Sequence, residues 1–139
     1  MANREILFRG KAINRVEGGE YRSNYKNGDW VYGLVTRVFD ERYKLPAEMT
    51  NTKGIGGIEV DYQTIGQYTG FTDKNGKKIF EGDIVRERGG ESYQGYYEID
   101  NVLTVKIPDI LVNFEMSYDC EYKIIGNIYD NPELIETEG

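Results

Sequence analysis

The side chains that could do chemistry in this chain are carboxylates, tyrosines and one thiol, because the 139 residues include no histidine. Histidine is the usual general base and zinc ligand near neutral pH, so Ser-His-Asp triads, Cys-His pairs and zinc sites of the Cys/His type are excluded. Cys120 lies between Asp119 and Glu121, whose negative charges disfavour the reactive thiolate. We therefore expect a structural or incidental cysteine.

Two pairs of carboxylates are spaced two residues apart, Glu81 with Asp83 and Asp119 with Glu121. On a strand, side chains at this spacing share a face and could bind Mg²⁺ or Ca²⁺ or exchange protons. The order Glu81-Gly82-Asp83 instead favours a turn at Gly82, with acidic side chains that are hydrated or accept hydrogen bonds from turn N–H groups. The second pair favours a solvated loop. We therefore predict no catalytic residue, no metal site and no cofactor.

Tyrosines and one lysine form the candidate interaction surface. Tyr93, Tyr96 and Tyr97 surround a glycine-rich loop, and exposed tyrosines on the loops of β-barrels are typical of binding surfaces. The alternative is that these rings cover the core. Lys53 lies in a second loop, Thr50 to Gly57, whose glycines could suggest a phosphate cradle, but no Gly-Lys-Ser/Thr follows. The candidate residues are therefore Tyr93, Tyr96, Tyr97 and Lys53.

The elements that must position these residues are short strands. The chain has 12 Tyr, 17 Gly and only 3 Pro, which is a β composition. Turn signals every 8 to 12 residues are typical of a small barrel or sandwich. The predicted strands are residues 5–13, 29–38, 58–63, 65–71, 77–80, 84–88, 96–107, 110–114 and 122–125. On the second of them, Trp30 and Tyr32 share one face, which we assign to the core.

The strongest local signal is the order Asp73-Lys74-Asn75-Gly76. It predicts a type I turn followed by a glycine in the left-handed conformation, which is the common short hairpin with a bulge.

Several of these segments together resemble a known family, the YopX-like proteins of phages and prophages. The resemblance rests on Ile65–Gly70, Asp73–Gly76, Ile79–Val85 and Ile125–Leu134, and on Arg4–Lys11 and Trp30–Gly33 near the start. It extends over nearly the whole chain and is weakest over residues 39–57 and 89–121. The resemblance implies a mostly-β fold with an SH3-like β-barrel in the C-terminal part. It implies no activity, because the family is uncharacterised.

Charge is divided unevenly along the chain. Residues 1–60 carry 10 Lys and Arg against 8 Asp and Glu, and residues 61–139 carry 7 against 16. We expect an N-terminal β-rich segment, residues 1–60, packed on an SH3-like barrel, residues 61–139; the alternative is that both form one compact unit. A basic footprint for DNA is absent from the larger part.

Location is inferred from what the sequence lacks. No run approaches the roughly 18 apolar residues of a membrane helix. With one cysteine and no apolar leader, we expect a protein of the host bacterial cytoplasm.

These observations predict a non-enzymatic, phage-encoded accessory protein that binds an unknown phage or host protein or a second copy of itself. A nucleic-acid-binding β-barrel is the alternative, and nucleic acid is the less expected partner. That alternative rests on the basic residues of the N-terminal quarter, Arg4, Arg9, Lys11, Arg15, Arg22 and Lys26.

Overall fold

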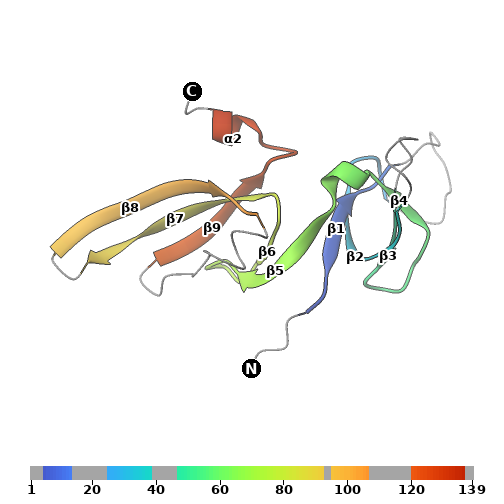
Figure 1. The fold of residues 1–139 in the computed structure, drawn as a ribbon, viewed down its shortest axis with the longest axis horizontal. Coiled ribbons are helices and arrows are strands. Elements are labelled where there is room, and N and C mark those ends of the chain that lie inside the picture. The colour runs from blue at the N-terminus through green and yellow to red at the C-terminus, as the bar shows by residue number, and fades with distance from the viewer. Residues whose placement is uncertain (1–4, 14–24, 39–46, 93–94, 107–119, 137–139) are drawn as a thin grey trace. The chain divides into compact units, whose positions relative to one another are not determined.

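The computed structural model describes residues 5–13, 25–38, 47–92, 95–106 and 120–136. It divides into two compact units, Met1–Gln67 and Tyr68–Gly139. The described residues are mostly β, which confirms the predicted class, and all strand pairing in them is antiparallel (Figure 1). The division predicted from the sequence, into residues 1–60 and 61–139, stays a prediction.

The first unit is built on four strands in the order β4-β3-β2-β1. They are β1 (Phe8–Lys11), β2 (Trp30–Arg37), β3 (Ala47–Asn51) and β4 (Ile58–Val60). A 3₁₀ turn, η2 (Tyr62–Thr64), follows β4 and leads into β5 (Gly66–Thr72). Strand β5 begins beside β1, where Gln67 lies opposite Phe8. Strand β3 was not among the predicted strands.

These four strands belong to a six-stranded sheet that continues from β1 into β5, and they curl so that β4 meets the residue after β1. Ala12 forms an isolated antiparallel bridge with Val60. Beside it, Ile13 N donates to Glu59 O at 2.9 Å and Asp61 N donates to Lys11 O at 2.8 Å. The concave face holds the core of this unit, which consists of Ala12, Val31, Ala47, Met49, Ile58 and Val60. This curvature decides which residues of β2 remain outside.

The face of β2 that enters the core is the one with Val31, not the one with Trp30. Val31 is fully buried, while Trp30 is half-buried and Tyr32 is exposed. The assignment of Trp30 and Tyr32 to the core was therefore wrong. Since side chains alternate along a strand, one buried position fixes the direction of all its neighbours. The sequence contains two apolar faces at β2, and the aromatic one is outside.

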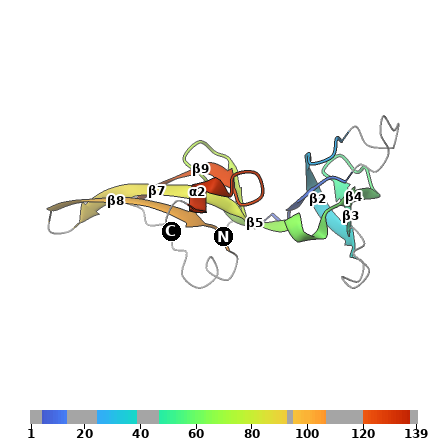
Figure 2. The same ribbon diagram turned by 90° about the horizontal axis from the view of Figure 1, so that it is seen from above.

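The second unit consists of a short hairpin and a three-stranded sheet. The hairpin pairs β5 with β6 (Lys78–Phe80). The sheet has the order β8-β7-β9, with β7 (Asp83–Ser92), β8 (Gly95–Thr104) and β9 (Cys120–Asn127). In both views α2 (Glu133–Glu136) follows the C-terminal end of β9 (Figures 1 and 2). The core of this unit is Ile79, Val85, Val105 and Tyr122, with Phe71, Leu103 and Ile124 packed against it.

Neither sheet closes into a barrel within the part of the chain that the structure describes. The described strands therefore support a mostly-β class, but they do not show the predicted SH3-like barrel. The predicted strand 110–114 lies outside the described residues.

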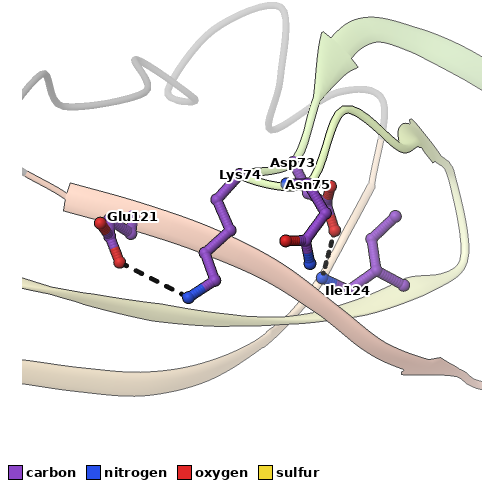
Figure 3. A network of polar contacts seen from close by, with 5 residues as sticks. All are labelled: Asp73, Lys74, Asn75, Glu121 and Ile124. Atoms are coloured by element: carbon purple, nitrogen blue, oxygen red, sulfur yellow. Dashed lines mark hydrogen bonds and ion pairs between the residues drawn. The ribbon is translucent and has the colours of Figure 1, made fainter.

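The turn at residues 73–76 attaches the hairpin to the edge of β9 (Figure 3). Gly76 has φ of 81° and its N–H donates to Asp73 O at 3.0 Å, which confirms the predicted turn with a left-handed glycine. Lys74 N donates to Tyr122 O at 2.8 Å, and Ile124 N donates to Asp73 Oδ2 at 3.1 Å. The turn thus satisfies backbone groups along an edge that would otherwise be open.

The Asp73 carboxylate is buried and accepts three backbone N–H groups. Besides Ile124 N, it accepts Asn75 N and Lys77 N, each at 2.9 Å from Oδ1. Burial alone raises the pKa of Asp73, but these three donors, together with the charge of Lys77, outweigh it and hold the pKa below its ordinary value of 3.8. The charged carboxylate is therefore the form that the fold prefers.

Acid should weaken the second unit through Asp73. Because its pKa is depressed in the folded state, the unfolded chain binds the proton more readily, so the stabilisation is present above about pH 4 and is lost as the pH falls through the folded pKa. We expect Asp73→Asn to lower the free energy of unfolding at neutral pH, and the difference from the natural chain to shrink below pH 4. Urea unfolding at several pH values measures it, and a difference independent of pH would contradict it.

A second prediction concerns Gly33, on the buried side of β2. A Cβ at this position would overlap the carbonyl oxygen of Thr50 on β3. We expect Gly33→Ala to cost about 2–4 kcal/mol of unfolding free energy, because backbone would have to move. Gly56→Ala is the matched control, since its Cβ would meet only the Thr50 hydroxyl at 3.1 Å. Equal thermal unfolding of the two variants would show that the close approach of β2 and β3 is not required.

Candidate binding surface

The structure does not bring the four candidate residues together in one unit. Lys53 is exposed in the first unit, in the turn after β3, whereas Tyr96 and Tyr97 belong to β8 of the second unit. Only the backbone of Tyr96 and Tyr97 is described, and Tyr93 lies outside the described residues. The tyrosine surface therefore stays a prediction.

Where the structure describes the carboxylates of the two pairs, their contacts are a hydrogen bond within a turn and an ion pair on the surface. Asp83 is buried and its Oδ2 accepts Phe80 N at 2.8 Å across the turn at Gly82, where φ is 91°. Asp119 lies outside the described residues, and the exposed Glu121 is 3.7 Å from Lys74 Nζ. No group of three or more His, Cys, Asp or Glu residues that could hold a metal occurs in the described segments.

The residues that the structure does bring together lie on the convex face of β1 and β2. Trp30, Tyr32 and Leu34 project from this face of β2, and β1 places Lys11 opposite Trp30 and Arg9 opposite Tyr32. Directly opposite residues of an antiparallel pair point to the same side of the sheet. We call the five residues Arg9, Lys11, Trp30, Tyr32 and Leu34 the aromatic stripe.

Two cations cover the Trp30 ring. The Arg9 guanidinium carbon lies 4.3 Å from the ring centroid, and Lys11 Nζ lies 5.1 Å from it. A cation over an aromatic face is attracted by the negative charge of that face, more strongly where water is excluded. Arg9 is only 5% exposed, so its charge is held against the ring, whereas Lys11 is half-buried. The stripe therefore combines positive charge with apolar surface.

The remaining two side chains of the stripe are apolar and open to solvent. Tyr32 is 39% exposed and Leu34 is 50% exposed. They lie on β2, an interior strand that pairs with β1 on one side and β3 on the other. Isolated exposed apolar side chains are common on protein surfaces, but a contiguous row beside fixed charges is typical of an interaction site.

A hydrogen-bonded loop joins β2 at Tyr32. Thr52 N donates to Tyr32 O at 3.0 Å, which joins the loop after β3 to β2. The Asn51 side chain then fixes the loop, because its Oδ1 accepts Lys53 N at 3.0 Å and Ile55 N at 2.9 Å. Lys53 follows Thr52 in this loop, and its part in binding stays a prediction.

Sequence reasoning missed the stripe because it divided the residues between two hypotheses. It placed Trp30 and Tyr32 in the core and assigned Arg9 and Lys11 to nucleic-acid binding. The usable signal was alternation in β1, where Arg9 and Lys11 are two apart and so share a face. Pairing that face with the aromatic face of β2 requires the register, which the sequence does not contain.

A comparison with protein-family models matches residues 16–136 to the family described as YopX protein. The chain belongs to the YopX family. The resemblance found in the sequence is thereby confirmed. No curated protein matches this YopX family member. Within its described residues, no helix is long and apolar enough to cross a membrane.

Trp30 is the only tryptophan in the chain, so its fluorescence reports directly on the stripe. We expect Arg9→Met to change the emission of Trp30 and to cost about 1–2 kcal/mol of unfolding free energy, since it removes a desolvated cation from the ring. Lys11→Met should change the emission with a cost below about 0.5 kcal/mol, because its head group is less buried. Emission spectra identical to that of the natural chain would contradict the contact.

Proposed function

We propose that this YopX family member is a non-enzymatic protein-interaction module, encoded by a phage or prophage, that binds a phage or host protein through the aromatic stripe. The observation that carries the proposal is the exposure of Tyr32 and Leu34 beside the fixed charges of Arg9 and Lys11. Aromatic and arginine side chains are enriched at protein interfaces and supply much of their binding energy. We place this activity in the host cytoplasm.

Protein suits the stripe better than nucleic acid does. Single-stranded nucleic acid is bound by stacking bases on free aromatic faces in a basic groove. Here two cations already lie over the Trp30 ring, and the adjoining Leu34 offers aliphatic surface that a protein side chain covers more effectively. The net charge of −7 also opposes long-range attraction to a polyanion.

For the fold, we propose that β5 to β9 form the core of an SH3-like barrel. The bonds from Lys74 N to Tyr122 O and from Ile124 N to Asp73 Oδ2 support this arrangement, because they join the β5–β6 hairpin to β9. A crystal structure with β5 to β9 in an open sandwich would contradict it.

The binding proposal predicts that Tyr32→Ser combined with Leu34→Ser abolishes capture of a partner. The full-length tagged chain is incubated with lysate of infected host cells, and retained proteins are quantified by mass spectrometry. We expect at least about a tenfold loss of a specifically retained protein, because tyrosine is enriched among interface hot spots and both substitutions remove exposed apolar surface.

Val102→Ser is the matched control, since Val102 is 44% exposed on a strand of the second unit. It should leave capture unchanged, and thermal unfolding should be similar for all the proteins because exposed substitutions cost little. Equal capture by the double variant would overturn the proposal. Retention that disappears after nuclease treatment would instead support the nucleic-acid alternative.

A further inference from the structure

We propose that the outer edge of β8 pairs with β8 of a second copy of this chain, in antiparallel orientation about Val102. This contact goes beyond the proposed function, because it uses a backbone edge of the second unit and not the aromatic stripe of the first. Three observations support it: the strand edges that the fold covers, the register of β8 with β7, and the order of charges along β8.

Three of the four strand edges are covered or very short. In the described residues the two sheets end at β4, β6, β8 and β9. Strand β4 bonds to the residues around Ala12, and β9 bonds to Asp73 and Lys74. Strand β6 has only three residues, and the N–H of its last residue donates to Asp83. Devices of this kind keep an edge from recruiting other chains.

Strand β8 shows none of these devices within the part of the chain that the structure describes. It lies at the margin of the three-stranded sheet and runs for ten residues, Gly95–Thr104, without proline or lysine (Figure 1). The contacts that support the proposed barrel join the hairpin to β9, so they leave this edge uncovered. A long edge without protecting residues is a template for a further strand.

The pairing with β7 determines which backbone groups of β8 point outward. Val105 N donates to Asp83 O and Val105 O accepts Gly82 N, each at 2.9 Å, so both groups of Val105 point toward β7. The register then continues without a shift along this half of β8. Because hydrogen-bonded positions alternate along an antiparallel pair, the N–H and C=O groups of Val102 and Thr104 point away from β7 and can bond to another strand.

A second copy supplies a strand whose side chains match this edge. Pairing about Val102 places this residue, which is 44% exposed, against its own counterpart. The same register places Glu98 opposite the exposed Lys106 on both sides of the axis, and Asp100 then faces Thr104. A register centred two positions earlier would instead place Asp100 opposite Asp100, where like charges repel. The strand is thus complementary to itself about one residue, as a two-fold axis requires.

The net charge of −7 opposes association only over long distances. At about 0.15 M salt, charges more than about 8 Å apart are largely screened. The attraction comes from backbone hydrogen bonds, apolar contact and the two cross-strand ion pairs, all of which act at short range. The contact is narrow, so the association is weak and requires a high protein concentration.

Sedimentation equilibrium of the full-length chain at increasing concentration, in about 0.15 M salt, tests this pairing. We expect a reversible equilibrium between monomer and dimer. Val102→Lys and Val102→Glu should each weaken dimerisation about tenfold or more, because each places like charges directly opposite one another. An equimolar mixture of the two variants should dimerise again, since opposite charges then face each other.

Two exposed lysines of the second unit provide a matched control. Lys106→Glu and Lys123→Glu change the net charge equally. Lys106→Glu should weaken dimerisation, and the addition of Glu98→Lys to the same chain should restore it. Lys123→Glu should leave dimerisation unchanged, because β9 lies on the other side of β7 from this edge. Equal effects of the two lysine substitutions would contradict the proposed edge.

Amide hydrogen exchange separates pairing of the backbone from contact between side chains. On dimerisation the amides of Val102 and Thr104 should exchange at least about tenfold more slowly, whereas those of Asn101 and Leu103, which already face β7, should change little. Circular dichroism and urea unfolding of each variant should match the natural chain, since exposed substitutions cost little stability. Dimerisation without this alternation, or a chain that is monomeric at every concentration, would overturn the inference.

The outcomes distinguish this pairing from the proposed function. If the chain stays monomeric while Tyr32→Ser with Leu34→Ser loses a captured protein, the pairing of β8 fails and the proposed function stands. If β8 pairs as expected while that double variant captures as much protein as the natural chain, the proposed function fails and the pairing stands.

Discussion

The burial of Val31 is the constraint on which the first unit depends. Side chains on a strand alternate between faces, so one fully buried position on β2 determines the direction of every neighbour. With Val31 inside the curled sheet, Trp30, Tyr32 and Leu34 must face outward. A shift of one residue in the register would place the aromatic side chains in the core and expose the valines.

The curvature of the sheet explains why the inner face can be filled by small side chains. The core contains Ala12 and Ala47 beside Val31 and Met49, and Gly10 lets β1 approach, because its Cα faces Met49 and Val60 closely enough that a Cβ would lie 3.2 Å from their side chains. A Trp ring in place of Val31 would overfill this interior. Trp30 and Tyr32 therefore lie outside, where Arg9 and Lys11 lie over the Trp30 ring and Tyr32 is exposed.

The second unit is subject to a different constraint, because β9 is an edge strand of its sheet. An edge strand has backbone groups with no partner in its own sheet, and it can recruit other chains. Asp73 and Lys74 cover this edge by a charged hydrogen bond to Ile124 and a backbone bond to Tyr122. The acidic residues that dominate this unit are thus partly structural, as Asp73 and Asp83 show, while Asp130 and Glu133 are exposed.

The sequence by itself determined the β class, the turn at Asp73 to Gly76, the family and the absence of histidine chemistry, because each depends on composition or on residues adjacent in the chain. The tertiary structure alone decided which face of β2 is buried, which strand meets Ala12, and that Arg9 and Lys11 lie over Trp30. Strand β2 has apolar side chains on both faces, so local pattern could not choose between them. The choice depends on volume and register among segments far apart in sequence, where β1, β3 and β4 surround an interior that accepts valine and excludes tryptophan.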